Sequence, residues 1–101
     1  MPNYKRYSVV EPWLLDRTFE HEEDDVRTFV VVEVADLKDK RNGDVFTAGA
    51  WRVRFTRLAG EEVQKPPYKT KTWFGETAWN SAERYALDSI FALRNGKDVP
   101  S

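Results

Sequence analysis

The chain has 101 residues, no cysteine, a net charge of −1, and 41% hydrophobic against 33% charged residues. This length predicts one domain with a single core, and the lack of cysteine excludes disulfides and thiolate metal sites. The sequence shows no apolar run long enough to cross a membrane and no secretory leader, so we expect a cytoplasmic protein without a membrane partner.

Residues 1–25 form an acidic N-terminal segment. They hold three basic and seven acidic groups, whereas residues 26–101 hold thirteen basic and ten acidic groups. The residue types at 4–11 favour a short extra strand, which Glu11-Pro12 is expected to end because a residue before proline avoids the helical region. A single helical turn is expected to begin at Pro12.

The strongest charge feature is the run from Glu20 to Asp25, which contains five carboxylates and the only histidine. A solvated loop is the plain interpretation of such a run. A divalent cation prefers carboxylate oxygens, but the spacing matches no known metal loop and lacks the glycine of a calcium loop. The third interpretation is an acidic surface that docks on a basic partner.

Residues 26–74 predict an antiparallel meander of three strands. The segment 26–37 is rich in β-branched residues, and Asn42-Gly43 then supplies a hairpin turn. A second strand is expected over 45–58, with a bulge or bend at Gly49. A polar loop is expected over 59–67, and a third strand begins at Tyr68.

Residues 77–95 predict the one helix of the chain, with Thr77 as N-cap and Asn95-Gly96 as the stop signal. Alanines recur on its inner side, together with Trp79, Ile90 and Leu93. Leu87 and Phe91 fall on the outer side, near Arg84, and predict a second contact surface for a partner or a second copy of the chain.

The expected fold class is therefore α+β in two layers: an antiparallel meander of three or four strands with one C-terminal helix packed across one face. We expect the following residues beneath the helix: Val30, Val32, Val34, Trp51, Val53, Phe55 and Phe74. Since side chains alternate along a strand, the open face should then combine cations with aromatic rings. Its expected members are Arg52, Arg54, Lys69, Lys71 and Trp73.

The segment from Val53 to Trp79 (VRFTRLAGEEVQKPPYKTKTWFGETAW) is similar in pattern to the last hairpin and helix start of a transcriptional coactivator family that binds single-stranded DNA. The resemblance implies nucleic-acid binding on the open sheet face, where cations neutralise phosphates and rings stack bases. The acidic run 20–25 and the alanine-rich helix depart from that family's pattern.

Catalysis has little support, because the one histidine lies in an acidic run without a nearby nucleophile and no glycine run precedes the helix. We therefore expect no enzyme, no cofactor and no metal. The leading hypothesis is a non-catalytic module that docks on a protein, such as an accessory or inhibitory factor of phage or mobile-element type. The expected partner-binding residues are Glu20, Glu22, Glu23, Asp24, Asp25, Arg84, Leu87 and Phe91. The alternatives are single-stranded nucleic-acid binding through the open face and, compatible with either, a homodimer through the outer helix face.

Overall fold

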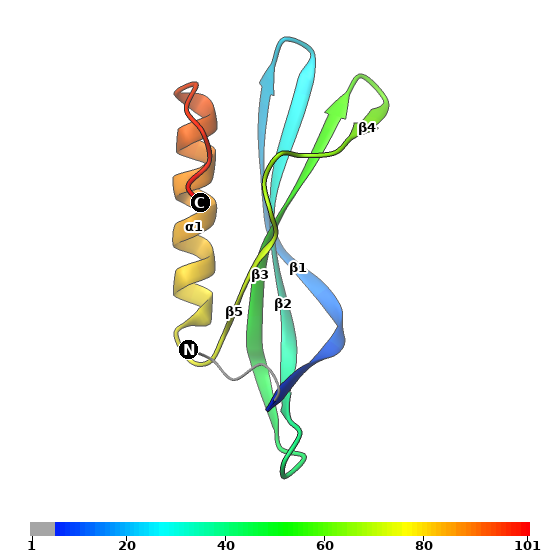
Figure 1. The fold of residues 1–101 in the computed structure, drawn as a ribbon, viewed down its shortest axis with the longest axis vertical. Coiled ribbons are helices and arrows are strands. Elements are labelled where there is room, and N and C mark those ends of the chain that lie inside the picture. Colours follow the sequence, from blue (N-terminus) through cyan, green and yellow to red (C-terminus); the bar gives the residue numbers. More distant parts are fainter. Residues whose placement is uncertain (1–5) are drawn as a thin grey trace.

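The computed structural model describes residues 6–101, which form a twisted antiparallel sheet with one helix along one face (Figure 1). This arrangement confirms the α+β prediction. The elements are β1 (Tyr7–Glu23), β2 (Val26–Asp39), β3 (Val45–Ala59), β4 (Glu62–Gln64), β5 (Lys71–Phe74) and α1 (Ala78–Arg94). No helix within residues 6–101 is long and apolar enough to cross a membrane.

The sheet order is β1-β2-β3, and β4 and β5 both pair with β3 along its other edge. The two long strands β2 and β3 pair from Val26↔Ala59 to Lys38↔Val45, so the Asn42-Gly43 turn closes the expected hairpin. A register shift between Ala50 and Phe46 confirms the bulge predicted around Gly49. A Cβ at that glycine would lie only 2.9 Å from the Leu37 Cβ, which explains why no side chain fits there.

Strand β1 differs from the prediction, because it continues through Glu11-Pro12 to Glu23 instead of breaking there. The Glu11–Pro12 peptide bond is cis, and the pairing with β2 shifts register between Val10 and Leu14. An edge strand accommodates proline because one side of it needs no hydrogen-bond donor. The prediction of a helical turn at Pro12 was therefore wrong, because Pro12 lies at a bulge in a continuous strand.

The core lies between the sheet and α1. Ala82 and Ala86 are fully buried, so the helix backbone approaches the sheet closely, and Ile90 fills the space beside them. Four of the predicted core residues belong to this cluster: Val30, Val32, Val53 and Phe55. The other three are only partly buried: Val34, Trp51 and Phe74.

The helix ends as predicted. Gly96 adopts a φ of 66°, its N–H donates to the Leu93 carbonyl at 3.2 Å, and the Lys97 N–H donates to the Ala92 carbonyl at 2.8 Å. These two bonds form a Schellman motif, which satisfies carbonyls that the helix leaves free. At the other end Thr77 occupies the N-cap position without a side-chain hydrogen bond. Trp79, expected on the inner side, is 50% exposed at the edge of the helix–sheet contact.

Candidate functional site

The β1–β2 hairpin carries the acidic run predicted from the sequence. Its first four residues belong to β1, so the loop that the sequence suggested is reduced to the two-residue turn Asp24-Asp25. Both aspartates have positive φ, 51° and 62°, the geometry of a tight turn that suits the twist of the flanking strands. The strands therefore hold the five carboxylates on a fixed frame at one end of the molecule.

A second acidic turn lies beside the first. Val26 pairs with Ala59, and the Gly60 N–H donates to the Asp25 carbonyl at 3.4 Å, so the β3–β4 turn adjoins the β1–β2 turn. Figure 1 shows both turns at the same end of the sheet, opposite the β2–β3 turn. We define the acidic end as the seven carboxylates that the two turns bring together. They are Glu20, Glu22, Glu23, Asp24, Asp25, Glu61 and Glu62.

The carboxylates of the acidic end are exposed, and most of them lack a cation. Glu20 lies 3.5 Å from Arg27, and Glu23 lies 3.5 Å from the His21 ring. Within residues 6–101 no ion pair reaches the other five side chains. Unpaired, exposed charges of one sign on a rigid frame attract a surface of the opposite sign and raise its rate of association.

The outer helix face is exposed as predicted. Leu87 is 39% and Phe91 56% exposed, and Arg84 lies on the same exposed side. The C-terminal end of α1 adjoins the β1–β2 hairpin, because a cavity of ≈ 320 Å³ is lined by residues of both, including Glu23 and Leu93. The acidic end and the Phe91 end of the helix are thus neighbours in space.

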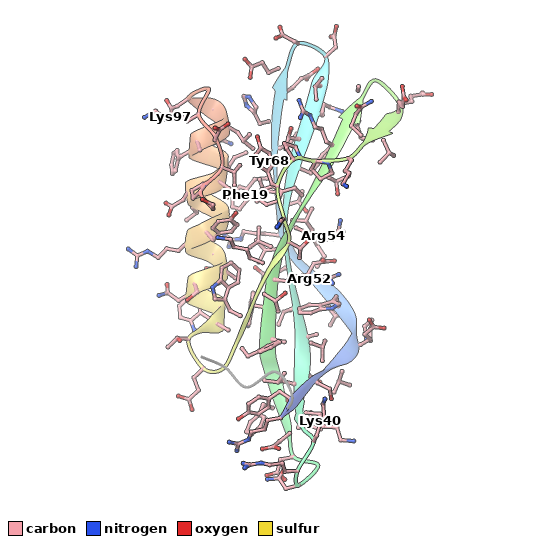
Figure 2. The ribbon with its side chains drawn as sticks, viewed as in Figure 1. Phe19, Lys40, Arg52, Arg54, Tyr68 and Lys97 are labelled. Carbon is pink, nitrogen blue, oxygen red and sulfur yellow. The ribbon has the colours of Figure 1, made fainter. Side chains whose placement is uncertain are left out.

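Arg52 and Arg54 lie on the sheet face away from the helix (Figure 2). They share one carboxylate. Their Nε atoms donate to the same Glu33 oxygen at 2.8 Å and 2.7 Å, and the Arg52 guanidinium stacks 4.3 Å from the centre of the Trp13 ring. Burial alone would raise the pKa of Glu33, but the hydrogen bonds and charges of Arg54 and Arg52 outweigh it and lower that pKa. The two arginines are therefore already partly neutralised and held in place.

This contact predicts a pH effect on stability. Since the pKa of Glu33 is lower in the folded than in the unfolded chain, its contribution is complete above the ordinary glutamate pKa and is lost as pH falls through the lowered value. At neutral pH we expect Glu33→Gln to reduce the free energy of unfolding by ~1–3 kcal/mol. Urea unfolding at several pH values should show the difference from wild type shrinking below roughly pH 4. A difference that stays constant with pH would contradict this role, and Glu76→Gln, at an exposed position, is the control.

The five residues expected on the open face do not share it. Lys71 pairs with the core residue Val53, and its Nζ lies 4.6 Å from the centre of the Tyr85 ring of the helix. Trp73 packs against the core, 5.6 Å from the same ring. The prediction of one face that combines these cations and rings was therefore wrong. Arg52 and Arg54 lie on the open side of the sheet, whereas Lys71 and Trp73 lie on the helix side. Lys69 lies in the exposed loop before β5.

A further cavity, ≈ 770 Å³ in volume, lies near the start of the helix. Its walls include Tyr7, Phe46 and Trp79 from three separate elements, and Glu76 is the one charged side chain among its lining residues in the described part of the chain. The cavity offers apolar area without groups that select one ligand, so we assign it no role.

The described residues form no metal centre, and no related protein is found for the chain. Among residues 6–101, no three His, Asp or Glu side chains are close enough together to hold a metal ion. Comparisons with protein-family models, with curated proteins and with solved structures find no match.

The sequence interpretation missed Glu61 and Glu62 as members of the acidic end. The signal was available, because a β2–β3 hairpin centred on Asn42-Gly43 places residues near 59–61 opposite the start of β2. The turn at Asp24-Asp25 immediately precedes that start. Hairpin register alone therefore indicates that the two acidic turns meet.

Proposed function

We propose that this protein is a non-catalytic binding module that docks on a protein partner through its acidic end. The observation that carries the proposal is that two acidic turns, separated by more than thirty residues of sequence, lie side by side at one end of the sheet. A flexible acidic tail would provide similar charge without fixed spacing. A rigid acidic surface instead complements a basic protein surface of matching shape, which gives specificity as well as attraction.

The chemistry of the partner follows from the charge. A surface rich in arginine and lysine, such as one that otherwise holds nucleic acid, offers the required cations. A protein that occupies such a surface acts as an accessory or inhibitory factor. The proposal retains the cytoplasmic location that the sequence analysis leads us to expect. It assigns no catalytic residue.

The same proposal gives the outer helix face a secondary role. Leu87 and Phe91 lie on the helix whose C-terminal end adjoins the acidic hairpin, so a partner that covers the acidic end can extend over them. Apolar side chains add contact area to an interface whose attraction is electrostatic. If these residues instead join two copies of the chain, the protein is a dimer in light scattering and Phe91→Asp makes it a monomer.

Calorimetric titration with an arginine-rich peptide at low salt tests the proposal. We expect the triple variant Glu22→Gln/Asp24→Asn/Asp25→Asn to bind the peptide roughly tenfold more weakly than wild type, since each exposed charge contributes ~0.2–1 kcal/mol. Asparagine retains the turn because it tolerates positive φ. The matched control, Glu76→Gln/Glu83→Gln/Asp88→Asn, removes one charge just before the helix and two charges on it, and should bind like wild type. Equal weakening of both variants would show that net charge, not the acidic end, attracts the peptide.

The nucleic-acid alternative has less support. Its open-face form requires five side chains on one surface, and the register of β5 separates them. The two arginines that remain on the open face share the Glu33 carboxylate, so they offer a phosphate less charge than two unpaired cations would.

A further inference from the structure

A third pocket lies on the helix side of the sheet, and Tyr68 lines both this pocket and the cavity beside the acidic end. This third pocket has a volume of ≈ 360 Å³ and is lined by the β5 approach, the middle of α1 and the C-terminal residues 99–101. Val99 is buried in the core, and the Tyr85 hydroxyl donates to the Pro100 carbonyl at 2.7 Å. These two contacts fix the C-terminal wall against the helix. The volume falls within the roughly 300–1,000 Å³ that is usual for small-molecule sites.

Two ammonium groups belong to this pocket. Lys69 is exposed at its rim, and Lys71 lies over the Tyr85 ring. Neither lysine has an ion pair within residues 6–101, and no acidic side chain is among the lining residues. Burial raises the pKa of the Tyr85 phenol, so that group adds no negative charge to the pocket. The lining side chains therefore carry two positive charges and no carboxylate; Lys69 has no ion pair in the described chain, and Lys71 contacts the Tyr85 ring.

Two aromatic rings complete the pocket. The Tyr68 ring lies 5.1 Å from the Phe55 ring, and the Tyr85 ring contacts both Phe55, at 6.3 Å, and Trp73, at 5.6 Å. Because core residues hold both tyrosines, their rings need little ordering when a ligand arrives. A planar ring of a ligand can stack on them, as bases do on aromatic side chains.

We propose that this pocket binds a nucleoside monophosphate group, with the phosphate at Lys69 and Lys71 and the base against Tyr68 or Tyr85. Lysine ammoniums bind phosphate as point charges, and the rings supply the apolar contact that inorganic phosphate cannot use. The same chemical group occurs in a free nucleotide and at the phosphorylated end of a strand. The proposal does not rest on the docking function proposed above, since the site includes none of the seven carboxylates of the acidic end, although Tyr68 also lines the cavity beside that end.

The test is calorimetric titration at low salt with three probes: adenosine monophosphate, adenosine and inorganic phosphate. We expect the nucleotide to bind at least about fivefold more tightly than either fragment, because one stacked base contributes ~1 kcal/mol or more. Lys69→Gln/Lys71→Gln should weaken nucleotide binding about tenfold, since it removes both charge-assisted contacts. The matched control, Lys38→Gln/Lys40→Gln, changes two exposed lysines near the β2–β3 turn and should leave binding unchanged.

Three results would overturn the proposal: no nucleotide binding by wild type, equal binding of phosphate alone, or equal weakening by the control pair. Lys69→Gln by itself is a second variant, because this exposed side chain has no ion pair in the described chain and its loss should not disturb folding. A titration with a 5′-phosphorylated trinucleotide distinguishes the two sources of the nucleoside monophosphate group, which are a free nucleotide and the phosphorylated end of a strand. Tighter binding of the trinucleotide assigns the pocket to strand ends, and equal binding assigns it to free nucleotides.

Discussion

Ile90→Ala is expected to lower the free energy of unfolding by ~2–5 kcal/mol, the largest effect of any single substitution considered for this protein. The Ile90 side chain is only 1% exposed and packs in the core cluster with Val30, Val32 and Val53. Alanines on the neighbouring turns of the helix already let the backbone approach the sheet, so little room remains for it to move in and fill the cavity. A loss of this size is a large part of the ~5–15 kcal/mol that holds a small domain folded.

Urea unfolding, followed by far-ultraviolet circular dichroism, measures this loss. The matched control is Leu87→Ala, which truncates an aliphatic side chain on the outer face of the same helix and should cost less than about 1 kcal/mol. If the two substitutions cost the same, Ile90 does not face the core and the packing of the helix on the sheet is wrong.

Charge reversal in both acidic turns is expected to abolish most of the binding to an arginine-rich partner. Glu22→Lys/Glu23→Lys and Glu61→Lys/Glu62→Lys should each weaken binding about tenfold, and their combination about a hundredfold. The effects should accumulate because the two turns face the partner together, although separate stretches of sequence supply them. Titration calorimetry with the wild type, the two double variants and the quadruple variant measures how much binding affinity each set of changes removes.

The control for this series is Glu76→Lys/Asp88→Lys, which makes the same change of charge at two exposed positions, one just before the helix and one on it. It should bind like wild type at moderate salt, where exposed charges farther apart than about 8–10 Å are largely screened from one another. If reversal at residues 61–62 leaves binding unchanged, the surface that binds the partner is confined to the first turn, and the two-turn acidic end is not the functional unit.

The hairpin and the helix could be predicted from the sequence because local signals specify them. Alternating residues and the Asn42-Gly43 turn set the β2–β3 register, and the register in turn sets which valines face the helix. The Asn95-Gly96 stop and the run of alanines determine where α1 ends and which side packs on the sheet. Each of these features depends on residues that are close in sequence.

The parts that could not be predicted depend on longer connections. No tight turn joins β3 to β5, so nothing local sets the register of Lys71 and Trp73, and a shift of one residue moves both to the other face. The prediction placed Lys71 and Trp73 on the same sheet face as Arg52, which differs from the observed register by one residue. Similarly, Pro12 indicates a break by local preference, but pairing with β2 resumes at Leu14 and makes β1 one strand. Tertiary pairing prevailed over local preference in both cases.

The candidate sites also divide into those that local sequence predicts and those that only the folded chain reveals. The acidic run 20–25 and the outer residues Leu87 and Phe91 were visible in the sequence because each depends on a local pattern. The joining of residues 61–62 to that run follows from hairpin register. The pocket of Lys69, Lys71 and the two tyrosines was not accessible, because the helix, β5 and the C-terminal residues meet there only in the folded chain.

The most direct test of the proposed docking function is a nuclear magnetic resonance titration of the labelled protein with an arginine-rich peptide. We expect the backbone amide signals of residues 20–25 and 60–62 to shift together with one affinity, and those of Arg52 and Arg54 to stay unchanged. Shifts centred on the arginine face, shifts in only one of the two turns, or none at low salt would contradict docking through the acidic end.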